Sequence, residues 1–160
     1  MTVHVIYGSD GGATRRIAER IAEKLSARTI PIGEASIADF EGCDLLVLGS
    51  PTYGIGDLQI DWETGVDLLD AADLNGKRVA LFGLGDQSGY PDSFVDALGI
   101  LYDHVVARGA EVVGFTDTTG YSYDESKAVR DGRFVGLVID QDGQAGKTGK
   151  RIEAWTSRII

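Results

Sequence analysis

Residues 3–14 read Val3-His4-Val5-Ile6-Tyr7-Gly8-Ser9-Asp10-Gly11-Gly12-Ala13-Thr14, which predicts a strand, a tight loop and the start of a helix. Residues 3–7 are mostly β-branched or aromatic, as in a short parallel strand that is buried on both faces. From residue 15 the period changes, because five apolar side chains fall on one helical face: Ile17, Ala18, Ile21, Ala22 and Leu25. The chain therefore begins with a βα unit.

The loop of this unit predicts a phosphate site. It offers backbone N–H groups, the hydroxyls of Ser9 and Thr14, and the positive end of a helix dipole. A tight turn with glycines for geometry alone is the alternative. The loop is neither G-x-G-x-x-G nor a Walker loop. Residues 145–148 (Ala-Gly-Lys-Thr) have the tail of a Walker loop, but Gln141 replaces the required glycine, so we expect a polar linker there.

Length and composition suit one globular domain over residues 1–160. The single cysteine, Cys43, excludes an intrachain disulfide and fits a reducing compartment, and we expect it to pack rather than react. No apolar run approaches the ~18 residues of a membrane span, and the N-terminus has no basic-then-apolar leader. We therefore expect a cytoplasmic protein that does not enter the membrane.

The net charge of −10 is concentrated in the middle of the chain. Ten carboxylates and two basic residues lie between Asp57 and Asp103. Such an acidic field repels nucleic acid and anionic membranes and attracts basic protein partners. Simple solubility is the alternative explanation.

Strands alternate with helices along the rest of the chain. Apolar runs predict strands at 29–32, 44–50, 77–83 and 111–115, and a further run at 134–139 resembles the second half of an edge strand that is interrupted by residues 116–133. Pro31 suggests an edge position for the second strand, and residues 33–43 suggest a polar connection. This alternation predicts an α/β fold with a parallel sheet and right-handed crossovers.

Three predicted strand-end loops carry the candidate site: 8–14, 50–56 and 83–91. Ligands of such sheets bind outside the carboxyl ends of the strands. The second and third loops bring Tyr53 and Tyr90 beside glycines, and an aromatic ring can stack on a flat ligand. Asp86 could accept a hydrogen bond from a ring N–H group. A phosphate at one end and a flat heteroaromatic between two tyrosines describe a mononucleotide.

These motifs resemble those of the long-chain flavodoxins. Ser9-Asp10-Gly11-Gly12-Ala13-Thr14 resembles the phosphate loop [ST]-x-T-G-x-T of that family, and the loops Ser50–Gly56 (followed by Gln59 and Trp62) and Gly83–Tyr90 resemble its two flavin loops. The resemblance implies a three-layer sandwich, a five-stranded parallel sheet of order 2-1-3-4-5 with an insertion in the last strand, and bound FMN. The order is taken from the family. The implied cofactor-binding residues are Ser9, Asp10, Gly11, Gly12, Ala13, Thr14, Pro51, Thr52, Tyr53, Gly54, Ile55, Gly56, Leu84, Gly85, Asp86, Gln87 and Tyr90.

Some positions depart from the family pattern. Gly11 stands in place of the central threonine of the phosphate loop, and Leu84 in place of a threonine that is common in the third loop. We expect the peptide between Gly54 and Ile55 to turn its carbonyl toward flavin N5 when that atom gains a proton, because glycine permits the rotation.

The resemblance implies a low-potential one-electron carrier, with no catalytic side chain and no metal. The implied partners are basic-faced redox proteins, such as an NADPH-dependent flavodoxin reductase, and an acceptor such as nitrogenase, and we expect a monomer. The insertion is expected to be a partner surface or a stabilising segment.

Two other classes compete with this interpretation. An NAD(P)H-dependent quinone or azo reductase shares the fold, but such enzymes add a nicotinamide platform for which no segment is evident. A phosphoacceptor receiver domain needs an aspartate at the end of the third strand, where this chain has Ser50-Pro51.

Overall fold

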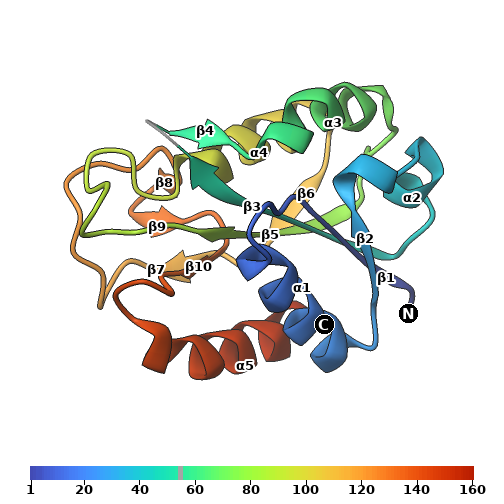
Figure 1. Ribbon diagram of the computed structural model, residues 1–160. Coiled ribbons are helices and arrows are strands. Elements are labelled where there is room, and N and C mark those ends of the chain that lie inside the picture. The colour runs from blue at the N-terminus through green and yellow to red at the C-terminus, as the bar shows by residue number, and fades with distance from the viewer. Residues whose placement is uncertain (54–55) are drawn as a thin grey trace.

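A twisted sheet lies between two layers of helices (Figure 1). The computed structural model describes residues 1–53 and 56–160. The main strands follow the order β10-β5-β3-β1-β2, and their neighbouring pairs are parallel. Their bounds are β1 (Val3–Tyr7), β2 (Arg28–Pro31), β3 (Leu45–Tyr53), β5 (Arg78–Leu84) and β10 (Leu137–Ile139). β2 lies at the edge, as Pro31 suggests.

The fifth position of the sheet is shared by two short strands. β6 (Glu111–Val113) pairs with the start of β5, and β10 pairs with its end. Counting β6 and β10 as one interrupted strand gives the predicted order 2-1-3-4-5 with an insertion in the last strand. The interruption is longer than residues 116–133, because the pairing with β5 stops at Val113 and resumes at Leu137.

The insertion, residues 114–136, folds into a small antiparallel sheet of its own. Its strands are ordered β7-β9-β8, with bounds β7 (Thr116–Asp117), β8 (Val129–Arg130) and β9 (Arg133–Phe134). Gly136 returns the chain to the main sheet at a point where a Cβ atom would collide with the carbonyl oxygen of Leu81, so glycine is required there.

The helices bury one apolar stripe each against the sheet. α1 (Ala13–Leu25) and α5 (Thr148–Ile159) cover one face, where Ile17, Ile21 and Trp155 are buried. α3 (Ile60–Ala71) and α4 (Asp96–Ala107) cover the other face with Trp62 and Leu98. The first helix and the alternation of strands with helices, both predicted from the sequence, are confirmed, and burial of these side chains is the main source of helix stability.

Short elements complete the fold. Residues 33–43 are not merely a polar connection, because they contain the end of a 3₁₀ turn (Ile32–Glu34) and α2 (Ile37–Glu41). Ser36 and Asp39 form a capping box at the start of α2, which explains why so short a helix begins there. β4 (Asp57–Leu58) pairs antiparallel with β3. Residues 145–147 form a 3₁₀ turn that leads into α5.

Candidate functional site

A cavity of about 310 Å³ opens at the carboxyl ends of the central strands. Its volume falls within the range of roughly 300–1,000 Å³ of small-molecule sites. Residues of all three predicted loops line it, together with two residues that follow β10: Ser9, Gly11, Ala13, Thr14, Pro51, Thr52, Leu84, Gly85, Asp86, Tyr90, Gln141 and Asp142. The topology thus brings the three loops to one place, as the strand-end rule predicts.

The first loop offers uncharged hydrogen-bond donors at one end of the cavity. The Gly12 N–H donates to Ser9 Oγ over 3.2 Å, and Gly12 has φ +89°, a left-handed conformation that favours glycine. α1 begins at the next residue, so its free N–H groups and its dipole face the loop. Thr14 is 2% exposed and lines the cavity. This arrangement suits a phosphate group.

Asp10, also a predicted site residue, does not line the cavity. Its Oδ1 accepts a hydrogen bond of 2.8 Å from Nε2 of Gln59, which is fully buried at the start of α3. Gln59 Oε1 in turn accepts from the Asp61 N–H group. Gln59 therefore ties the first loop to α3.

The second loop is described in part. Pro51 and Thr52 line the cavity, and Thr52 Oγ1 accepts a hydrogen bond of 3.1 Å from the Ala97 N–H group at the start of α4. Gly56 is buried and has φ +91°. Gly54, Ile55 and the predicted rotation of their peptide lie outside the described residues, as does the side chain of Tyr53.

The third loop carries four lining residues: Leu84, Gly85, Asp86 and Tyr90. Asp86 Oδ1 accepts from the N–H groups of Ser88 and Gly89, at 3.1 and 3.0 Å, and so shapes the turn. Tyr90 is 53% exposed, and its ring is available for stacking. Gln87 was predicted to contact the cofactor, but it does not line the cavity, and its side chain is buried among other partners.

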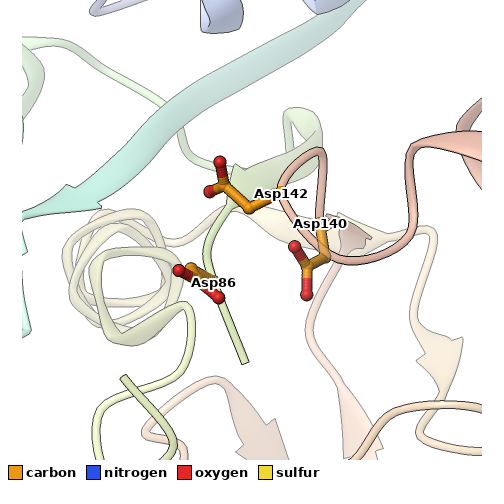
Figure 2. Close-up of side chains that lie close together, drawn as sticks. All are labelled: Asp86, Asp140 and Asp142. Atoms are coloured by element: carbon orange, nitrogen blue, oxygen red, sulfur yellow. The ribbon is translucent and has the colours of Figure 1, made fainter. Parts of the chain in front are cut away.

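Sequence reasoning missed Gln141 and Asp142. They follow β10 directly. The rule that ligands bind outside the carboxyl ends of parallel strands therefore also applies to them, because the apolar run 134–139 ends the fifth strand. Figure 2 shows Asp142 with Asp140 on the turn after β10, and Asp86 on the third loop opposite them. Carboxylate oxygens of these three residues lie within 4.8 Å of one another. Two of the three line the cavity, so this side of it is strongly negative.

The described lining residues fit a mononucleotide with a flat ring system. Among them are no Lys, Arg, His or Cys, so the phosphate would be held by amides, hydroxyls and the α1 dipole. Asp86 and Asp142 follow β5 and β10, which lie on the other side of β3 from β1 and its loop, and their negative charge would oppose further negative charge on a bound ring. The site is therefore suited to binding a ligand that carries a phosphate and a flat ring, and to tuning the charge of that ring.

Comparison with known proteins decides the family. A family model described as flavodoxin matches residues 5–155. The chain belongs to the flavodoxin family. A flavodoxin of Synechocystis is 44% identical over 161 residues, which cover 98% of this chain and 95% of that protein. Flavodoxin 1 of Escherichia coli is 43% identical, with coverage of 97% and 90%.

A solved flavodoxin structure agrees with the fold in detail. The crystal structure of the Fusobacterium nucleatum flavodoxin, bound to flavin mononucleotide, superposes with a TM-score of 0.91 at 34% identity. The match covers 99% of this chain and 96% of that one. The length of 160 residues and the insertion are consistent with the long-chain type. Flavodoxins are electron-transfer flavoproteins and not enzymes, so the quinone reductase and receiver-domain alternatives are set aside.

One negative finding concerns the membrane. Within residues 1–53 and 56–160, no helix is both long and apolar enough to cross a bilayer.

Proposed function

We propose that this flavodoxin is a low-potential one-electron carrier in which all of residues 1–160 form one FMN-binding domain. The observation that carries this proposal is the cavity. Its proposed phosphate ligands follow β1, whereas Tyr90 and Asp86 follow β5 and Asp142 follows β10, on the other side of β3 in the sheet. FMN supplies the redox chemistry, and the protein supplies binding, orientation and electrostatics.

Each loop has a distinct proposed role. Ser9, Thr14 and the amides of residues 11–14 bind the phosphate. Pro51 and Thr52 form one wall of the cavity, and Tyr90 stacks on the ring and shields it from water. Asp86 and Asp142 oppose negative charge on the reduced cofactor and so lower its potential. Leu84 and Gly85 line the same cavity. Asp10 and Gln87 act on the loops that carry the site, since their side chains bond to Gln59 and Asp140. The predicted cofactor-binding residues of the second loop, Tyr53, Gly54, Ile55 and Gly56, keep that proposed role.

The acidic middle of the chain is the proposed docking surface for basic redox partners, namely an NADPH-dependent flavodoxin reductase and an acceptor such as nitrogenase. Ten carboxylates lie from Asp57 to Asp103, and in the sequence they begin directly after the second loop and lie on both sides of the third. Opposite charge on a partner would speed encounter and orient the cofactor edge toward it. We propose a monomeric, cytoplasmic carrier.

Electron transfer is tested with the FMN-loaded protein, NADPH, a basic-faced flavodoxin reductase and cytochrome c. We expect cytochrome c reduction to require both the reductase and this protein. Omission of the reductase is the control: rapid NADPH oxidation by this protein alone would contradict a carrier role and support an NADPH-dependent enzyme.

The same assay tests the docking surface through its salt dependence. The second-order rate constant of reduction should fall about tenfold or more between roughly 50 and 500 mM salt, because screening shortens the reach of exposed charges. A rate constant that is independent of salt would contradict docking on the acidic surface, while leaving FMN binding intact.

A further inference from the structure

Gln87 lies on the third cofactor loop, but its side chain makes contacts away from the cavity. It is 6% exposed. Its Nε2 donates to Asp140 Oδ2 over 2.7 Å, and its Oε1 accepts from the Ser122 N–H group over 2.5 Å. Its own backbone N–H also donates to Asp140 Oδ2, over 3.2 Å. One amide thus connects segments that are 35 and 53 residues away in the sequence.

Asp140 is a fully buried carboxylate at the first position after β10. Besides the two donors of Gln87, it accepts a hydrogen bond of 2.8 Å at Oδ1 from the Gly143 N–H group. Three N–H donors therefore compensate its buried charge. Gly143 follows Asp142, which lines the cavity, so Asp140 shapes both this turn and the third loop (Figure 2).

The insertion contributes the Ser122 N–H group to this hydrogen-bond network. Ser122 lies between Tyr121, whose hydroxyl donates to Val138 O over 2.6 Å, and Tyr123, whose ring stacks on Phe94 with centroids 5.4 Å apart. These contacts hold the Ser122 N–H group against β10 and the start of α4. The insertion is therefore packed firmly at the point where it meets Gln87.

We propose that Gln87 and Asp140 form a buried brace through which the insertion fixes the third cofactor loop, so that Gln87 is a positioning residue for the FMN site. This inference rests on the proposed function. The same loop carries Asp86 and Tyr90 into the cavity. Without the brace, the loop samples other conformations before binding, and the cofactor binds more weakly because the competent conformation is less populated.

The chain offers a matched control for Gln87. Gln144 Nε2 also donates to the insertion, at Gly120 O over 2.8 Å, but Gln144 lies outside the third loop and does not line the cavity. Gln87→Leu and Gln144→Leu therefore each remove one glutamine amide that contacts the insertion. FMN affinity is measured by quenching of flavin fluorescence on titration of the apoprotein.

We expect Gln87→Leu to raise the FMN dissociation constant about tenfold or more, since it leaves buried donors and acceptors unpaired beside the loop. Gln144→Leu should change it less than about twofold. Equal effects of the two substitutions, or no effect of Gln87→Leu in a folded protein, would overturn the brace. A wild-type protein that binds no FMN would instead overturn the proposed function.

Exchanging the two side chains, in the double variant Gln87→Glu with Asp140→Asn, distinguishes a positioning role of the pair from a general contribution to stability. Gln87→Glu alone places two carboxylates together and should weaken binding most. Adding Asp140→Asn restores a donor that faces the new carboxylate at position 87, and it should recover part of the affinity, although the backbone N–H of residue 87 loses its charged acceptor. Strictly additive effects would show that the two side chains do not act together, and they would overturn the proposal.

Hydrogen exchange of the wild-type protein gives a test that does not depend on whether variants fold. Coupling between two sites is reciprocal. If the hydrogen bonds of the brace strengthen FMN binding, then FMN binding must stabilise those hydrogen bonds. We expect FMN to slow amide exchange at Ser122 and Gly143 about tenfold or more relative to the apoprotein. Unchanged exchange at both amides, in a protein shown to bind FMN, would overturn the inference.

Discussion

The two ends of the cofactor cavity are both held by a buried glutamine, but in opposite ways. At the phosphate end, Gln59 lies in the scaffold at the start of α3 and reaches out to Asp10 on the loop. At the ring end, Gln87 lies on the loop and reaches back to Asp140 and to the insertion. The phosphate loop is otherwise shaped by its own residues, through the Gly12–Ser9 hydrogen bond and the α1 terminus. The ring loop depends on distant segments.

This difference predicts a division of labour. The phosphate end supplies local, preorganised donors, and its variants should change affinity for the phosphate group alone. The ring end, formed by Asp86, Tyr90 and Asp142, is coupled to the insertion. Changes there should therefore alter the affinity for the flavin ring, which FMN and riboflavin share. The dissociation constants of FMN and of riboflavin, which lacks the phosphate, distinguish variants of the two ends.

Thr14→Val should give the largest effect at the phosphate end. The substitution removes a buried hydroxyl from the cavity and leaves the helix start intact. Hydrogen bonds to charged groups are worth about 1.5–3 kcal/mol, so the FMN dissociation constant should rise about 10- to 100-fold. Riboflavin affinity should change little. Both are measured by fluorescence titration.

The matched control is Thr156→Val, because Thr156 is also buried on a helix but bonds to Ile152 O of its own helix. It should leave both affinities near the wild-type values. A Thr14→Val variant that loses riboflavin as strongly as FMN would contradict the assignment of this end to phosphate.

The insertion should loosen at alkaline pH. Burial raises the pKa of Tyr121 from 10.0 to about 12, against the opposing effect of nearby Arg151. The unfolded chain therefore releases this proton near pH 10, whereas the folded chain retains it until about pH 12. Stability is complete below about pH 10 and falls as the pH rises toward about 12, by about 2 kcal/mol from this group.

Urea unfolding of the wild type and of Tyr121→Phe between about pH 9 and 11, a range that spans the ordinary tyrosine pKa, measures this contribution. The variant has no proton to lose at this position, so its free energy of unfolding should decline less steeply. Parallel declines in the two proteins would show that Tyr121 does not titrate as its burial requires.

Gly11→Thr should strengthen the phosphate end by a smaller amount. Nothing in the described structure lies within 4 Å of the place where a Cβ atom of residue 11 would be, so the side chain can be accommodated in the apoprotein. The family pattern has a threonine here, and one added hydroxyl donor should lower the FMN dissociation constant about fivefold. Gly11→Val supplies the bulk without the hydroxyl. Equal affinities of the two variants would contradict a hydroxyl contact.

The fold was largely predictable because its signals are local. Buried parallel strands give continuous apolar runs, and the helices show their apolar stripes. Even the split edge strand could be inferred, because the two apolar runs at 111–115 and 134–139 lie on either side of a polar, tyrosine-bearing stretch. The helix α2 was not predicted, because its start depends on the Ser36–Asp39 capping box rather than on a long apolar stripe.

The site was predictable at the phosphate end and less so at the ring end. A βα loop with hydroxyls and glycines carries its chemistry within a few residues. In contrast, the role of Gln87 depends on Asp140 and Ser122, which only the folded chain brings together. A sequence motif places Gln87 near the cofactor, but it cannot show which way the side chain points.

The central claim is that this cavity binds one FMN. Absorption spectroscopy of the purified protein, before and after incubation of the apoprotein with FMN and removal of the excess, tests it most directly. We predict the two flavin bands in the visible and near-ultraviolet, at one FMN per chain, and weaker bands in Thr14→Val after the same incubation and removal of excess FMN. A wild-type protein that remains colourless after incubation would contradict the claim.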